Sequence, residues 1–240
     1  MPLPKIDLPT FDLKIPSTGQ EIKVRPFKVK EEKMLLMAAE SDDIEEVVRA
    51  TQQVLNNCIL TKGVDVEKMP FFDVDFLFIA LRAKSVSETI DLEFTCNAVV
   101  DDQKCGTVFP GDLDLTSCKI VKDKQITENI NLGNVSVKMK YPSYSIMKHL
   151  DAGEQVLDRK IKIIAACIDM IVRGEEVYTR KDFTVKELSD FVEELAEYQY
   201  SKLENFIDNF PYFVVDIEVM CPKCKTKHRK EYRDFSAFFQ

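Results

Sequence analysis

Four of the seven cysteines form two pairs whose spacing suits the binding of one metal ion. Cys221 and Cys224 form a compact Cys-x-x-Cys motif, which can present two thiolates to a tetrahedral metal. Cys96 and Cys105 are separated by eight residues and are followed by Gly106, at a place where a metal-binding turn often requires a positive φ angle. The residue types therefore predict a structural zinc ion held by Cys96, Cys105, Cys221 and Cys224.

Other uses of these cysteines have different structural requirements. Reduced cysteines also serve as small, partly buried apolar side chains. A thioredoxin-like redox role for Cys221 and Cys224 requires a strand-to-helix junction, whereas the pattern on both sides of this motif indicates strands. No spare acidic or histidine ligand apart from His228 is placed to hold an open coordination position, so a catalytic zinc is not expected. The sequence leaves open whether Cys118 or His228 replaces one of the four ligands.

Alternating apolar residues before each pair predict the strands that position it. The apolar positions are Ile90, Leu92 and Phe94 before the first pair, and Val215, Ile217 and Val219 before the second. Because period-two alternation buries one face of a strand, each pair is expected at the turn of a hairpin. The two turns would close on one ion as a zinc-ribbon-like site.

The rest of the pattern predicts an α+β fold, in which a helical unit packs with these β-hairpins. We expect a single interdigitated domain over residues 1–240, because a shared zinc would join two pairs that have 115 residues between them. Its expected parts are an extended arm and hairpin at 1–27, helices at 28–85 and 143–210, and β-rich zinc-ribbon-like segments at 86–141 and 212–240.

Apolar periodicity and capping residues indicate individual helices in the second half of the chain. The longest is expected from about residue 154 to 172, with Gly174 as its C-terminal cap. Thr184 and Glu187 form a capping box that opens another helix, and a last helix is expected from about residue 200 to 209.

Composition and motif content argue against several classes of function. The net charge of −8 disfavours general nucleic-acid binding, and no run of 18 apolar residues predicts a membrane span. The odd number of cysteines and the lack of a signal-peptide layout favour a reducing cytosol. The chain lacks G-x-S-x-G, P-loop and G-x-G-x-x-G motifs, and its only histidines are His149 and His228. We therefore expect no catalytic residues and no enzyme activity.

A basic cluster near the second pair supports an alternative function. It comprises Lys223, Lys225, Lys227, Arg229, Lys230 and Arg233. Zinc ribbons with such strands can contact nucleic-acid phosphates, so the alternative hypothesis is a zinc-ribbon nucleic-acid-binding regulator. Alternating Lys and Arg also suit the solvent face of an edge strand, where they prevent unwanted strand pairing. In a chain this acidic we favour the edge-strand interpretation.

Three segments are candidates for contacts with other proteins. Residues 1–16 form a proline-rich arm that either lies along a partner or is a loose terminus, so that its deletion is expected to leave the fold intact. The helix around Phe72–Leu81 is apolar on nearly all sides, which fits a buried helix or one that also faces another subunit, so a homo-oligomer stays open. The chain also carries a C-terminal group of aromatic residues, Phe235, Phe238 and Phe239.

Two further stretches are read together with the cysteine pairs. They are residues 25–38, RPFKVKEEKMLLMA, and residues 75–86, DFLFIALRAKSV. In these stretches the chain resembles the baseplate hub and hub-assembly proteins of T-even-like contractile-tailed bacteriophages, over most of its length. The resemblance implies a non-enzymatic virion-morphogenesis protein that acts in assembly of the central baseplate hub, as a hub component or as an assembly chaperone. It implies other hub and tail proteins as partners, in the host cytoplasm during assembly or in the virion tail baseplate. The resemblance gives no information on metal binding, so the zinc prediction rests on cysteine spacing alone.

Overall fold

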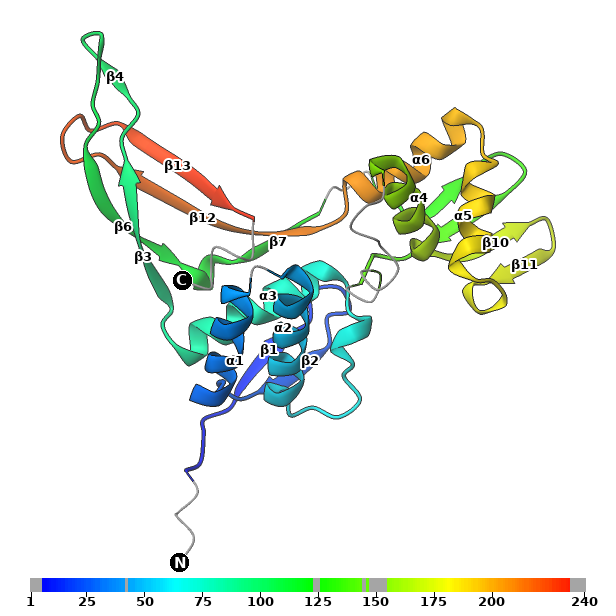
Figure 1. Ribbon diagram of the computed structural model, residues 1–240, viewed down its shortest axis with the longest axis horizontal. Helices are drawn as coiled ribbons and strands as arrows, with labels where there is room; N and C mark the ends of the chain where they lie inside the picture. The colour runs from blue at the N-terminus through cyan, green and yellow to red at the C-terminus, as the bar shows by residue number, and fades with distance from the viewer. Residues whose placement is uncertain (1–5, 42, 123–125, 144–145, 147–154, 234–240) are drawn as a thin grey trace, which may run out of the picture. The chain divides into compact units, whose positions relative to one another are not determined.

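The computed structural model is mixed α+β, with small antiparallel sheets (Figure 1). It describes residues 6–41, 43–122, 126–143, 146 and 155–233. The chain forms two compact units, and it passes from the first to the second and back again twice. Unit 1 comprises residues 1–66, 72–121 and 212–240, and unit 2 comprises residues 67–71 and 122–211. One interdigitated domain would require a fixed junction between these units, and it stays a prediction.

Unit 1 begins with a β-hairpin and a set of helices. These elements are β1 (Phe11–Lys14), β2 (Glu21–Val24), α1 (Val29–Glu40), α2 (Ile44–Cys58), η1 (Val66–Lys68) at the boundary with unit 2, and α3 (Phe71–Ser85). The hairpin and the helices lie where the sequence pattern predicts them. The predicted arm of residues 1–16 is too long, however, because it includes β1 and Ile15, which is only 3% exposed. Deletion of the whole segment would therefore damage the fold.

Helix α3 is buried within unit 1. Its buried side chains include Phe72, Leu77, Phe78 and Leu81. The prediction that this helix contacts a partner is therefore wrong for these side chains, because the chain's own residues cover them. The buried carboxylate of Asp73 accepts hydrogen bonds from the backbone N–H of Ser17, at 2.9 Å, and from its hydroxyl. These bonds attach the turn between β1 and β2 to α3.

The β part of unit 1 positions the cysteines. Its elements are β3 (Thr89–Thr95), β4 (Val99–Val100), β5 (Gln103–Lys104), β6 (Val108–Asp114), η2 (Leu115–Ser117), β7 (Lys119–Val121), β12 (Tyr212–Met220) and β13 (Lys227–Tyr232). Strands β3 and β6 pair with each other, and the second sheet has the order β13-β12-β7. Strand β6 also packs against β12, where a Cβ added to Gly111 would lie 2.7 Å from Val219 Cγ1. This close approach places the two cysteine-bearing hairpins beside each other.

The described part of unit 2 is a four-stranded antiparallel sheet with the helices α4, α5 and α6. Its elements are β8 (Asn129–Asn131), β9 (Ser136–Met139), α4 (Val156–Cys167), β10 (Ile168–Arg173), β11 (Glu176–Thr179), η4 (Arg180–Asp182), α5 (Val185–Glu193) and α6 (Glu197–Asp208). The sheet has the order β11-β10-β9-β8. Residues from the sheet and from all three helices form one core, which includes Val137, Ile164, Leu188 and Phe206. The side chain of Thr184 accepts a hydrogen bond from Glu187 N–H and caps α5, as the sequence predicts.

The predicted helix over residues 154–172 is wrong beyond Cys167. From Ile168 the chain is strand β10, which pairs with β9 on one side and with β11 on the other. The apolar run contains Ile168, Ile171 and Val172, whose β-branched side chains suit a strand. Gly174, predicted to cap the helix, lies in the turn between β10 and β11 with a φ angle of +60°. The β content of residues 168–179 therefore corrects the helical assignment of that part of 143–210.

Several sequence predictions concern residues outside the described part of the chain. They include His149, residues 144–145 and 147–154 of the helical region expected at 143–210, and the aromatic residues Phe235, Phe238 and Phe239. Within the part that the structure does describe, no helix has the length and apolar character needed to cross a bilayer.

Candidate metal centre

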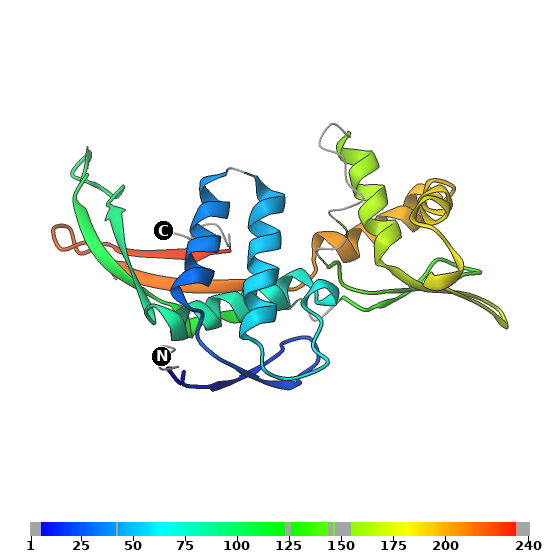
Figure 2. The same ribbon diagram turned by 60° about the horizontal axis from the view of Figure 1, so that its bottom comes forward.

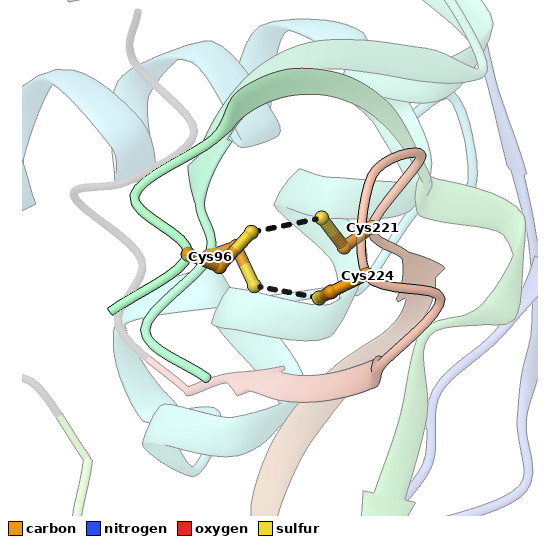
Figure 3. Close-up of side chains that lie close together, drawn as sticks. Cys96, Cys221 and Cys224 are labelled. Carbon is orange, nitrogen blue, oxygen red and sulfur yellow. Dashed lines mark hydrogen bonds between the residues drawn. The ribbon is translucent and has the colours of Figure 1, made fainter. Parts of the chain in front are cut away.

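The four cysteines of the two pairs meet in the β part of unit 1. Their Sγ atoms all lie within 4.8 Å of one another. Cys96 Sγ lies 3.5 Å from Cys224 Sγ, and Cys105 Sγ lies 3.8 Å from Cys221 Sγ, so these contacts join one pair to the other. In Figure 3 the sulfurs of Cys96, Cys221 and Cys224 point toward one another from two separate turns. Four thiols in this arrangement could hold one metal ion.

The turn that carries the first pair is closed by two backbone hydrogen bonds. The Cys96 N–H donates to Thr107 O at 2.8 Å, and the Gly106 N–H donates to Cys96 O at 3.0 Å. Gly106 has a φ angle of +61°, as its position after the cysteine predicts. The turn therefore brings the residue before Gly106, the second cysteine of the pair, back beside the first.

The turn that carries the second pair repeats the same hydrogen bonds. The Cys221 N–H donates to Thr226 O at 3.0 Å, and the Lys225 N–H donates to Cys221 O at 3.0 Å. Lys225 occupies the position that Gly106 has in the first turn, with a φ angle of +60°. The left-handed region is unfavourable for a lysine. The conformation of Lys225 is therefore imposed by the hydrogen bonds of the turn and is not an intrinsic preference of the residue. The two turns are local structural equivalents.

The wider spacing of the first pair comes from an inserted hairpin. Strands β4 and β5 pair with each other between the two cysteines, and the Cys105 N–H donates to Ala98 O at 2.8 Å to close the hairpin at its base. Asp101 and Asp102 form its tip with φ angles of +50° and +59°. Positive φ at both central residues is typical of a two-residue hairpin turn. The first pair is therefore a Cys-x-x-Cys-like turn with a hairpin inserted in it.

Each turn combines one buried and one half-buried sulfur. Cys96 and Cys221 are 1% and 0% exposed, whereas Cys105 and Cys224 are half-buried. Burial raises the pKa of the Cys96 thiol to about 12. Thr226 Oγ1 lies 3.3 Å from Cys224 Sγ, and hydrogen bonding with Thr226 lowers the pKa of the Cys224 thiol to about 6.

The half-buried sulfur of the first turn has the same kind of neighbour. Thr107 Oγ1 lies 3.2 Å from Cys105 Sγ, and hydrogen bonding from Thr107 lowers the pKa of the Cys105 thiol. Because metals bind the thiolate form, these hydroxyl groups favour the metal-binding state of one cysteine in each turn.

His228 lies beside the cluster, whereas Cys118 lies outside it. His228 Nε2 is 3.2 Å from Cys96 Sγ, and its ring centroid is 6.2 Å from that of Phe109. Cys118 follows η2, where its N–H donates to Leu115 O at 3.2 Å. Among the described residues, the one group close enough to hold a metal consists of the four predicted cysteines. That these cysteines are the ligands stays a prediction.

Two basic residues of β13 are paired with acidic residues of β12. Lys227 Nζ lies 3.0 Å from Glu218 Oε1, and an Arg229 nitrogen lies 3.4 Å from Asp216 Oδ2. Lys119 of β7 also pairs with Asp216. Because β13 is an edge strand of its sheet, these pairs fit the edge-strand interpretation of the basic cluster.

Sequence reasoning missed the equivalence of the two turns. The signal that reveals it is the repeated pattern Cys-x-Thr, which occurs at Cys105-Gly106-Thr107 and at Cys224-Lys225-Thr226. The different spacing of the cysteines and the different middle residue conceal this repeat.

Comparison with known proteins identifies one family. A family model described as T4 bacteriophage base plate protein matches residues 8–240. The matched segment includes all four clustered cysteines and most of both units. No curated protein and no solved structure matches the chain.

Proposed function

The chain belongs to the T4 bacteriophage base plate protein family, and on this basis we propose that it is a non-enzymatic protein of phage tail morphogenesis. It acts in assembly of the central baseplate hub, either as a hub component or as an assembly chaperone. Its partners are other hub and tail proteins, which it binds in the host cytoplasm during assembly. As a hub component it would also stay in the virion tail baseplate.

The observation that carries this proposal is the extent of the family match. The match runs from residue 8 to residue 240, so the relationship is not confined to one unit or to the cysteine turns. A baseplate is a large protein assembly, so protein–protein contacts are the expected activity of the chain. The choice between component and chaperone concerns what happens to these contacts after assembly.

Removal of this protein from the phage that encodes it tests the proposal. Electron microscopy should then show tail assembly stopped before the baseplate hub is complete, and expression of the chain in trans should restore it. Complete and infectious particles without the protein would refute the proposed function. Mass spectrometry of purified virions separates the two forms of the proposal, since a hub component is present in virions and a chaperone is absent.

The second part of the proposal is a structural zinc ion held by the four clustered cysteines. In a tetrahedral site with Zn–S bonds of about 2.3 Å, the sulfurs lie about 3.8 Å apart. The contacts of 3.5 Å and 3.8 Å between the two pairs fit that geometry. By joining two turns from distant parts of the sequence, the ion would act as a structural link rather than as a catalyst.

Metal content of the purified, freshly reduced protein tests the zinc site. Inductively coupled plasma mass spectrometry should find about one zinc per chain for a single four-thiolate site. Cys221→Ser should lose both the zinc and stability, whereas the matched control Cys118→Ser should keep the zinc. His228→Ala should also keep it if the cysteines are the only ligands. Absence of zinc from the reduced wild-type protein would refute this part of the proposal.

The alternative function, a nucleic-acid-binding regulator, makes a different prediction. It requires DNA or RNA binding that weakens steeply with salt and is lost when Lys225, Lys227 and Arg229 are all changed to Glu. The ion pairs of Lys227 and Arg229 with β12 leave less positive charge for phosphates. Absence of binding at low salt would exclude this alternative.

A further inference from the structure

Helices α1 and α2 of unit 1 form an open surface groove. They pack side by side (Figure 2), and the groove between them has a volume of about 530 Å³. The α1 side of the groove is formed by residues at helical spacing, namely Lys30, Lys33, Met34 and Met37. The α2 side has the same spacing, from Glu46 to Gln53. Seven residues of helix rise about 10 Å, so the groove is about two helical turns long.

Small residues form the floor of the groove, and its α1 side carries two flexible apolar methionines beside its lysines. Ala38 and Ala50 are both 7% exposed and lie on facing helices. Met37 is 60% exposed, and Met34 beside it is half-buried. Methionine adapts its shape to a partner, and small residues leave room for another backbone. Two packed helices with such a groove present the surface that the apolar face of a third helix requires.

The charge of the groove selects an acidic partner. Lys30 and Lys33 are exposed, and neither forms a salt bridge in the part of the chain that the structure describes. Arg49 adds a third positive charge. A guanidinium nitrogen of Arg49 lies 2.8 Å from a carboxylate oxygen of Glu45, which is exposed on the same helix. Glu46 is the one acidic residue among the described residues that line the groove. Two copies of this groove facing each other would bring their positive charges together, which disfavours a second copy as the occupant.

The two helices are fixed to each other before any partner binds. The guanidinium of Arg25 donates two hydrogen bonds to Glu31 on α1, at 3.0 and 2.7 Å, and a third to Asn57 O on α2, at 3.0 Å. The backbone N–H of Arg25 also donates to Cys58 O at 3.0 Å. A preformed groove reduces the ordering cost of binding, which favours a specific contact.

From these features we propose that the groove between α1 and α2 binds an acidic amphipathic helix of a partner protein. The bound helix places apolar residues at i, i+3 or i+4, and i+7 over the methionines and alanines, with carboxylates next to Lys30 and Lys33. This inference rests on the proposed function, because it names the contact through which a baseplate assembly protein would hold a partner.

Synthetic helical peptides provide a direct test with the full-length chain. The probe is a fluorescently labelled peptide with Leu at i, i+3, i+4 and i+7 and Glu at the flanking positions. Two controls have the same composition in scrambled order, or Lys in place of Glu. Fluorescence anisotropy should show binding of the acidic amphipathic peptide and of neither control peptide. Hydrogen exchange should then show that the bound peptide protects α1 and α2.

Matched charge reversals in the chain identify the site. Lys30→Glu with Lys33→Glu should weaken peptide binding by about tenfold, which corresponds to about 0.7 kcal/mol for each lysine. Lys14→Glu with Lys23→Glu makes the same charge change on the exposed face of β1 and β2 and should leave the affinity unchanged. Circular dichroism should show that both variants are folded.

Three outcomes would overturn the inference. They are no binding of the acidic amphipathic peptide, equal binding of the scrambled peptide, and self-association of the chain that Met37→Glu abolishes, which would assign the groove to a second copy. Failure of the peptide test leaves the phage assembly test unaffected, because that test removes the whole protein. The proposed function and the groove can therefore fail separately.

Discussion

Gly111→Ala should separate the two strands that bring the cysteine turns together. A Cβ at this position would lie 2.7 Å from Val219 Cγ1 and 2.9 Å from Phe94 Cε2. Ordinary van der Waals contact begins at 3.4 Å, so Val219 or the β6 backbone must move by 3.4 − 2.7 = 0.7 Å. Neither neighbour can yield freely, because the valine side chain is β-branched and the phenylalanine ring belongs to the apolar cluster under the cysteines.

The expected cost follows from two opposing effects. Overpacking of a well-packed core costs about 1–3 kcal/mol. Replacing glycine by alanine also restricts the unfolded chain, which returns about 0.4–1 kcal/mol. We therefore expect Gly111→Ala to lower the free energy of unfolding by about 1–2 kcal/mol. Because β6 and β12 lead to the two turns, a zinc ion held by the four cysteines should also be bound more weakly in the variant.

Urea denaturation at constant pH measures the effect, and a double-mutant cycle assigns it. Val219→Ala removes the methyl group that the new Cβ would meet, so Gly111→Ala should cost less in that background, with a coupling above about 0.5 kcal/mol. Asp112→Ala, an exposed change at the next residue of the same strand, should stay within about 0.5 kcal/mol of the wild type. A Gly111→Ala protein as stable as the wild type, with no coupling to Val219, would refute the reasoning.

Three further changes test other parts of the molecule. Glu31→Gln should lower the free energy of unfolding by about 3 kcal/mol at pH 7, because it leaves Arg25 without its buried carboxylate. Hydrogen bonding to Arg25 lowers the pKa of Glu31, so the wild type should lose this stabilisation as pH falls below about 4.3. The variant has no carboxyl group at position 31 and should show no such loss. Urea denaturation of both proteins at pH 7 and below about pH 4.3 checks the sign. Lys225→Gly should be stabilising by about 0.5 kcal/mol, because relief of the left-handed backbone exceeds the added freedom of the unfolded chain, whereas Gly106→Ala should cost about 1 kcal/mol. If both changes had the same sign, the two turns would not be equivalent. Phe206→Ala should cost about 3–5 kcal/mol through the cavity it leaves, and hydrogen exchange should increase in unit 2; unchanged protection there would contradict its place in that core.

Local patterns in the sequence were sufficient for many elements. The alternation that ends at Cys96 and at Cys221 predicts strands β3 and β12, since one face of each strand is buried. Thr184 and Glu187 predict the start of α5, because capping depends on residues within one helical turn. Residue type and spacing also predicted that the four cysteines cluster, as they do, and their role as zinc ligands is a proposal.

The limits of local reasoning are clearest after Cys167. The apolar run from Ile161 to Val172 fits both the helical period and a buried strand, and short apolar runs of this kind cannot be assigned from periodicity alone. Strand pairing resolves the ambiguity, because β9, from an earlier part of the chain, and β11, the next strand along it, supply the hydrogen bonds that keep residues 168–173 extended. The error therefore lies where a strand depends on pairing with other segments, which the periodicity of the run itself does not show.

What the sequence determined by itself was the chemistry of the metal-binding candidates and the hairpins that carry them, because both depend on neighbouring residues. Only the tertiary structure showed that the two turns are equivalent and how they are brought together. Their meeting depends on the packing of β6 against β12 at Gly111. This residue approaches Val219, which lies 108 positions further along the chain. A glycine inside a strand shows in the sequence only that a side chain is missing, and the fold shows which side chain occupies the space.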